Sequence, residues 1–158
     1  MISTRSSLVA FFAIALLIVR APACGGGDEV KVTVVAVLAT SKNKDVDPKC
    51  ACLPKEVQKN YPELTGFKIK RYTCQELSVG DKFDFPSGLK DKNGPVIIPV
   101  SIKKGKGKDD RIGLTVEPPE AGLIEYTSCC GKFFPIVTRY KTPDGETLII
   151  AIRVQCCK

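Results

Sequence analysis

Cysteine is the residue type in this sequence that offers the most chemistry. The chain has 158 residues, with eight cysteines and no histidine. Two cysteines stand alone, and the other six form three close pairs: Cys24, Cys74, Cys50-x-Cys52, Cys129-Cys130 and Cys156-Cys157. Thiolates bind soft metal ions when they are reduced, and they cross-link the chain when they are oxidised. For an exported chain, a disulfide framework is the first expectation.

Strand geometry limits how these cysteines can pair. Neighbouring residues of a strand point to opposite faces, so the members of an adjacent Cys-Cys pair are poorly placed to bond each other. A hairpin whose loop is Thr142 to Gly145 places Cys130 opposite Cys157 and Cys129 diagonal to Cys156. We therefore predict the bridges Cys130–Cys157 and Cys129–Cys156. A third bridge is expected between Cys74 and either Cys52 or Cys50.

The alternative is a site for a soft metal ion, built from reduced cysteines. The C-x₂-C spacing of zinc ribbons is absent, and no histidine is present to complete a mixed site. The sequence therefore favours disulfides over metal, and we predict no cofactor.

The missing histidine also excludes familiar catalytic arrangements. Neither a Ser-His-Asp nor a Cys-His arrangement can form. The glycines near Gly105 lack the phosphate-binding pattern of P-loops. Two acidic pairs, Asp45 with Asp47 and Asp109 with Asp110, lack the ligand spacing of a calcium loop. We therefore predict a protein that is not an enzyme and has no catalytic or metal-ligating residue.

The N-terminal segment has the features of an export signal. Arg5 precedes the apolar run Leu8 to Val19, and Ala21-Pro22-Ala23 is typical of a cleavage site. Twelve apolar residues are too few to span a bilayer, which needs about 20. The sequence thus predicts a signal peptide at 1–23, a flexible tether at 24–29 and a domain at 30–158. The mature protein would be periplasmic, displayed on the cell surface or secreted.

Cys24 has two interpretations. As the first mature residue before a run of glycines, it resembles the lipid-bearing cysteine of a bacterial lipoprotein. Ordinary cleavage would instead leave Cys24 for a disulfide. If Cys24 carries lipid, seven cysteines remain, and Cys50 is then expected to be unpaired.

The charge is moderately basic. Arg5 and Arg20 belong to the expected signal, so the formal charge of +7 falls to +5 in the mature chain. Basic residues gather in one segment that is either an anion-binding loop or a solvated loop: Lys103, Lys104, Lys106, Lys108 and Arg111. No aromatic residue interleaves with these lysines, so nucleic acid is not an expected partner. The expected partners are an envelope protein or an anionic surface, with membrane contact only through the signal peptide or a lipid on Cys24.

Hydrophobic periodicity predicts an α+β domain that is mostly antiparallel β-structure. A strand, a short helix and a second strand would be followed by a β-rich sandwich or curled sheet. The expected strands are 30–39, 66–74, 82–85, 95–103, 111–116, 123–127, 133–141 and 146–155, with a helix from Pro54 to Tyr61. A turn is expected at Pro86-Ser87-Gly88, and Pro99 belongs on a sheet edge or at a bulge.

Phe133 and Phe134 should point to opposite faces of their strand. Unless both faces are covered, one of the two rings is exposed and is the first candidate for a contact surface.

Several runs resemble an uncharacterised family of short exported proteins from planctomycete-like bacteria: VVAVLAT with VDP, ELTGFKIKRYTC, TSCCGKFFPIVTRY and TLIIAIRVQ. The resemblance covers about Val30 to Gln155. It implies a bacterial envelope or secreted protein of β-rich architecture, and it implies no activity, ligand or site residue. The sequence thus predicts a non-enzymatic structural or interaction domain of the envelope.

Overall fold

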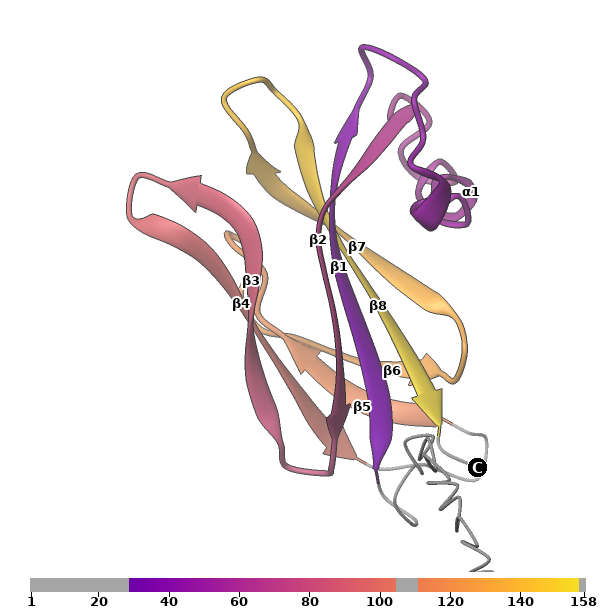
Figure 1. The fold of residues 1–158 in the computed structure, drawn as a ribbon, viewed down its shortest axis with the longest axis vertical. Coiled ribbons are helices and arrows are strands. Elements are labelled where there is room, and N and C mark those ends of the chain that lie inside the picture. The colour runs from indigo at the N-terminus through magenta and orange to yellow at the C-terminus, as the bar shows by residue number, and fades with distance from the viewer. Residues whose placement is uncertain (1–28, 105–110, 157–158) are drawn as a thin grey trace, which may run out of the picture.

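Eight strands form two four-stranded antiparallel sheets that pack face to face (Figure 1). The computed structural model describes residues 29–104 and 111–156, apart from the side chains of Lys104 and Cys156. Sheet A has the strand order β2-β1-β8-β7, and sheet B has the order β3-β4-β5-β6. The strands are β1 (Val30–Thr40), β2 (Gly66–Leu77), β3 (Lys82–Asp91), β4 (Gly94–Lys104), β5 (Arg111–Val116), β6 (Ile124–Cys129), β7 (Phe133–Lys141) and β8 (Thr147–Cys156). The predicted mostly antiparallel β-structure is confirmed, and it has the form of a sandwich.

The strand β1 is an interior strand of sheet A, and both of its faces are apolar and buried. It pairs with β2 on one side and with β8 on the other. Val32, Val34 and Ala36 face sheet B, while Val35 and Val37 belong to a second buried cluster on the outer face of sheet A. The nearly continuous apolar run of β1 therefore serves two cores at once.

The main core lies between the two sheets. Alternating residues of the facing strands fill it, as the period of two in a strand requires. Its largest fully buried members are Phe85, Ile98, Ile102, Ile112, Leu114, Leu148, Ile150 and Ile152.

Two short helical turns cover the outer face of sheet A on the side away from sheet B (Figure 1). The 3₁₀ turn η1 (Pro48–Cys50) begins after Asp47, whose carboxylate accepts a hydrogen bond from the Lys49 amide. The helix α1 (Leu53–Val57) carries a proline in its first turn and buries Leu53 and Val57. It is shorter than the expected Pro54 to Tyr61. With so little helix in the described residues, the α+β assignment is corrected to an all-β sandwich.

Two prolines behave differently from expectation. The predicted turn at Pro86-Ser87-Gly88 is instead an irregularity inside β3, where the buried Ser87 hydroxyl donates to the Val96 carbonyl. Pro99 lies in β4, which is an interior strand, and not on an edge. The Pro99 carbonyl accepts a hydrogen bond from the Glu117 amide, just beyond the last paired residues of β4 and β5. The N–H group that proline lacks is therefore missing at the end of the β4–β5 pairing, where no further strand hydrogen bond is lost.

The two ends of the sandwich differ. At one end β1 begins beside the last residues of β2 and β8, where Val30 pairs with Leu77 and with Cys156. At the opposite end lie the β3–β4, β5–β6 and β7–β8 connections, of which the β7–β8 loop lies near the top of Figure 1. We call this second end the loop end. The expected hairpin of β7 and β8 is confirmed, with a register shift between Val137 and Lys141.

Candidate functional site

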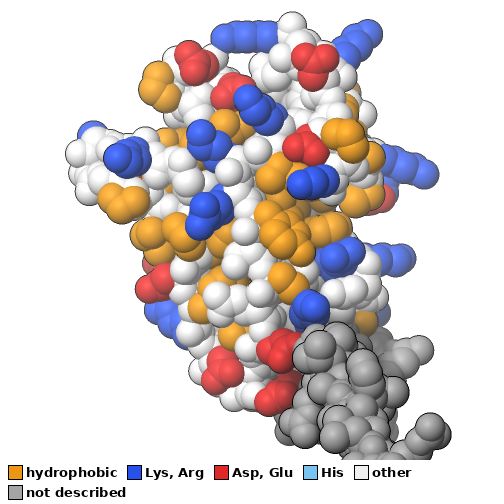
Figure 2. All heavy atoms as spheres, viewed as in Figure 1, with side chains coloured by type: hydrophobic (Ala, Val, Ile, Leu, Met, Phe, Trp, Pro, Cys, Tyr) orange, Lys and Arg blue, Asp and Glu red, His pale blue; other side chains and the backbone are white. Residues whose placement is uncertain are grey.

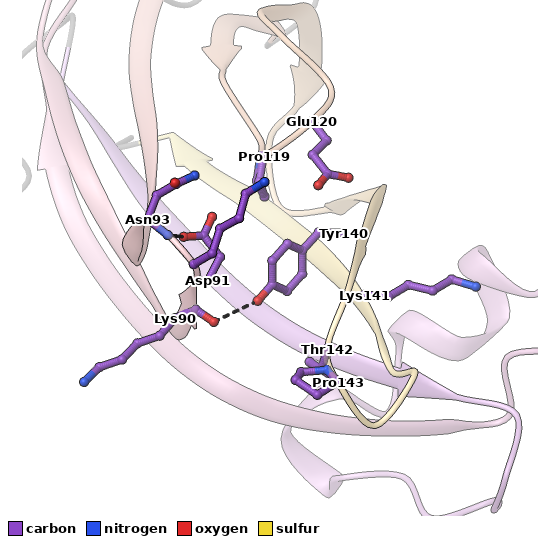
Figure 3. Close-up of a pocket in the computed structure, with 10 residues that line it drawn as sticks. Lys90, Asp91, Asn93, Pro119, Glu120, Tyr140, Lys141, Thr142 and Pro143 are labelled. Atoms are coloured by element: carbon purple, nitrogen blue, oxygen red, sulfur yellow. Dashed lines mark hydrogen bonds between the residues drawn. The ribbon is translucent and has the colours of Figure 1, made fainter.

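The most complete candidate site is a cleft at the loop end, built by connections from both sheets (Figure 3). Its volume is about 710 Å³. We call it the loop-end cleft, and it is lined by Lys90, Asp91, Lys92, Asn93, Pro119, Glu120, Tyr140, Lys141, Thr142 and Pro143. Loops held on a rigid β-scaffold are common places for binding residues.

Tyr140 ties the two sides of the loop-end cleft together. Its ring is 8% exposed and belongs to the main core. Its hydroxyl donates to the Lys90 carbonyl at 3.1 Å, which joins β7 of sheet A to β3 of sheet B (Figure 3). Because the hydroxyl already has a backbone partner, Tyr140 holds the shape of the cleft while the side chains around it remain free to contact a ligand.

Glu120 has the most unusual backbone of the cleft. The Ala121 amide donates to the Pro118 carbonyl, and Glu120 has a φ of 62°. A turn with proline at its second position and positive φ at its third is of type II, and glycine is the usual residue at that third position. Glutamate there is strained, and strained residues cluster at functional sites.

Local hydrogen bonds shape the other two loops. The Asn93 amide donates to the Asp91 carboxylate at 2.7 Å, which fixes the β3–β4 turn. The Gly145 amide donates to the Thr142 carbonyl at 2.9 Å, and the Glu146 amide donates to the Thr142 hydroxyl. Lys42 also donates to the Asp144 carbonyl at 2.6 Å, whereas the bonds named here use no side chain of the lysines that line the cleft.

The lining residues carry both signs of charge. The lysines Lys90, Lys92 and Lys141 and the carboxylates of Asp91 and Glu120 all line the cleft, and in Figure 3 the side chains of Lys90 and Lys141 extend away from Tyr140. The ion pairs found among the described residues, Lys59–Glu56 and Lys103–Glu125, both lie elsewhere. Figure 2 shows basic and acidic side chains interspersed at the loop end. The cleft therefore offers donors and acceptors to a polar partner.

The loop-end cleft was not predicted from the sequence. Pro118-Pro119 and Thr142-Pro143-Asp144-Gly145 indicate only breaks between strands. The detectable signal was the order Pro119-Glu120, since proline followed by a residue other than glycine is unusual in a type II turn. Nothing in the sequence placed the three loops beside one another.

The described cysteines are mostly thiols. Cys50, Cys52, Cys74 and Cys129 are free, and Cys130 is disulfide-bonded. The bridge Cys130–Cys157 therefore stays a prediction. Cys50 is buried, with its thiol 3.3 Å from the Asp47 carbonyl, and burial raises the pKa of this thiol.

The predicted bridge from Cys74 to Cys52 or Cys50 is absent. The thiol of Cys50 lies near the Phe67 carbonyl at the start of β2, and Cys74 is seven residues further along that strand. Seven strand residues span about 23 Å, whereas the Cα atoms of a disulfide lie within about 7 Å. Cys74 instead pairs with Thr33, whose hydroxyl donates to its sulfur at 3.5 Å.

The predicted bridge Cys129–Cys156 is also wrong for this structure, because Cys129 is a free thiol. Cys129 ends β6 and pairs with Arg111 in sheet B, whereas Cys156 ends β8 in sheet A. The prediction extended the β7–β8 hairpin back through Cys129, but β7 begins only at Phe133.

Other predicted features are placed as follows. Lys103 pairs with Glu125 at 3.5 Å, and Arg111 is exposed at the start of β5. The side chains of Lys104, Lys106 and Lys108, the signal peptide at 1–23, Cys24 and Cys157 lie outside the described residues. Within the described ranges, no cluster of three or more histidine, cysteine, aspartate or glutamate residues is arranged to hold a metal ion.

The exposed phenylalanine is Phe134, with 41% of its surface accessible, while Phe133 is partly buried. Phe134 stacks on Tyr126 of β6, with 4.4 Å between ring centroids.

No helix in the part of the chain that is described has the length and hydrophobicity to cross a bilayer. Comparison with known protein families, curated proteins and solved structures finds no match to this chain.

Proposed function

We propose that this protein is an exported, non-enzymatic interaction module of the bacterial envelope that holds a partner protein in its loop-end cleft. The observation that carries the proposal is the cleft itself, where three loops from two sheets meet around the strained Glu120. A binding role explains why a strained residue is kept at the rim, because strain at a loop persists where the surrounding structure uses it.

The position of the cleft supports this role. The chain enters the domain at the start of β1, and the cleft lies at the other end of the sandwich. Eleven residues of β1 span about 36 Å. A domain tethered through residues 24–29 would thus present the cleft away from its point of attachment, whether Cys24 carries lipid or not.

The chemistry of the cleft favours a protein partner. Its lining combines lysines and carboxylates with the apolar rings of Pro119 and Pro143. Mixed charges around a small apolar centre are typical of transient protein interfaces, in which charge complementarity fixes the register of the partner.

Site-specific photo-crosslinking in the producing cell tests the proposal. A photoreactive residue at Asn93 or Glu120 should give one adduct of the same partner, whereas one at the exposed Val79, at the opposite end, should give none. Adducts from Val79 but not from the cleft positions, or no adduct from any of the three, would contradict it.

A further inference from the structure

A second feature, separate from the loop-end cleft, lies on the outer face of sheet A. Arg153 of β8 pairs with Phe133 of β7 and with Thr33 of β1, so the three residues form one row across the sheet. The guanidinium carbon of Arg153 lies 4.8 Å from the centroid of the Phe133 ring. This cation–π contact fixes the direction of the arginine without using its hydrogen-bond donors.

Arg153 makes no ion pair among the described residues, although Glu76 lines a second, neighbouring hollow that Arg153 also borders. The side chain is partly buried, and its Nε atom is buried without a hydrogen-bond partner. Neither of the ion pairs found in the described part of the chain includes it. A buried donor to which no acceptor is offered costs about 1–3 kcal/mol, so an arrangement of this kind calls for an explanation.

Arg153 borders a hollow of about 520 Å³ between α1 and the turn that joins β6 to β7. We call it the Arg153 hollow, and it is lined by Cys52, Leu53, Glu56, Lys59, Gly131, Lys132, Phe133 and Arg153. Glu56, its one carboxylate, is already paired with Lys59 at 2.6 Å. Lys59, Lys132 and Arg153 stand against this one carboxylate, so the lining of the hollow has an excess of positive charge.

We propose that the Arg153 hollow binds an oxyanion, a phosphate or carboxylate group, between the guanidinium of Arg153 and the ammonium of Lys132. An arginine held by stacking and a lysine on a neighbouring turn form a charged pair that is common in oxyanion recognition. The ring of Phe133 forms an apolar wall beside the pair, so the anionic group can belong to a larger molecule. A phosphate group and a carboxylate group would make the same contacts with Arg153 and Lys132, and the experiment below distinguishes the two groups.

The test uses the purified mature chain, titrated at low ionic strength with inorganic phosphate and, separately, with acetate. Amide NMR shifts should change at Gly131, Lys132 and Arg153 and saturate, and chloride at the same ionic strength should not reproduce them. Tighter binding of phosphate identifies a phosphate site, and tighter binding of acetate identifies a carboxylate site. Shifts that are equal for all three anions would overturn the proposal.

Matched variants give a second readout. Arg153→Gln should weaken anion binding at least tenfold and Lys132→Gln severalfold, while Arg139→Gln, an exposed arginine on β7, should leave it unchanged. If Arg153→Gln unfolds, the exposed Lys132→Gln still decides the question, and unchanged binding in that variant would overturn the proposal. Crosslinking from the loop-end cleft should be unaffected in Lys132→Gln, so failure of one proposal leaves the other standing.

Discussion

Glu120 is the one residue other than glycine with a positive φ in the described part of the chain. The left-handed backbone conformation destabilises a residue that has a Cβ atom by about 1–2 kcal/mol. Replacement by glycine removes this strain, but it also stabilises the unfolded chain by increasing its conformational entropy, which offsets part of the gain. We expect Glu120→Gly to raise the free energy of unfolding by about 0.5–1 kcal/mol in urea denaturation. The same variant should give less of the crosslinked adduct from Asn93.

The matched control is Glu117→Gly. Glu117 is an exposed glutamate on the other side of Pro118-Pro119, and its φ is negative. It should destabilise slightly. A loss of stability in Glu120→Gly equal to that of the control would show that Glu120 is not strained.

Tyr126 makes a pH-dependent prediction. Its hydroxyl is buried with no hydrogen-bond partner among the described residues, and this burial raises the pKa of the phenol. Above pH of about 10 the unfolded chain releases a proton that the folded chain retains, so stability falls as the pH rises. Tyr126→Phe should match or exceed the wild-type stability at pH 7, by up to about 1 kcal/mol, with an advantage that grows above pH 10.

Unfolding at a series of pH values measures this difference, with Tyr72→Phe as the control because Tyr72 is 55% exposed. An advantage of Tyr126→Phe that does not change between pH 7 and pH 11 would argue against burial as the cause.

The cysteines can be tested by alkylation of the native protein followed by peptide mass mapping. Cys52 and Cys129 are exposed and should react first, whereas Cys50 should react only on unfolding because it is buried and its pKa is raised. Recovery of Cys52 and Cys74 in one disulfide-linked peptide before reduction would contradict the structure, in which both are free thiols.

At the scale of elements, α1 stabilises the fold by covering sheet A. Leu53 is 2% exposed and packs with Val35, Val37 and Phe67 in the outer cluster. We expect Leu53→Ala to lower the free energy of unfolding by about 2–4 kcal/mol, because it leaves a cavity on that face. Lys55→Ala, on the exposed side of the same helix, should change it by less than about 0.5 kcal/mol. Equal effects of the two variants would mean that α1 is not part of the folded core.

The elements were largely predictable because periodicity reports local burial. Strands such as Arg111–Val116 alternate cleanly, and Val30–Thr40 is apolar on both faces, so their positions followed from the residues alone. The errors arose where tertiary contacts override local signals. Ser87 finds a backbone partner inside β3, and Pro99 meets the end of β5, neither of which a local pattern reveals.

The candidate sites were not predictable, because each joins segments that are distant in sequence. Tyr140 meets Lys90 across 50 positions, and Arg153 meets Phe133 through the register of β7 on β8. The predicted bridge Cys129–Cys156 is wrong for the same reason, since it requires β7 to begin at Cys129, four residues before Phe133.

On the scale of the whole molecule, the two described ends of the chain and the loop-end cleft lie at opposite ends of the sandwich. The first and last strands, β1 and β8, pair along their whole length at the centre of sheet A, so both described termini lie at one end. This arrangement suits a tethered module because attachment leaves the loop-end cleft unobstructed. It is also consistent with an exported protein, for which the signal at 1–23 remains a prediction.

Lysine footprinting of the mature protein on isolated envelopes of the producing cell tests the central claim most directly. The exposed Lys90, Lys92 and Lys141 line the loop-end cleft, and Lys82 lies at the opposite end, at the start of β3. Acetylation of the three cleft lysines should fall severalfold when the partner is bound, while that of Lys82 stays unchanged. Equal acetylation of all four lysines with and without envelopes, or protection of Lys82 alone, would contradict the account.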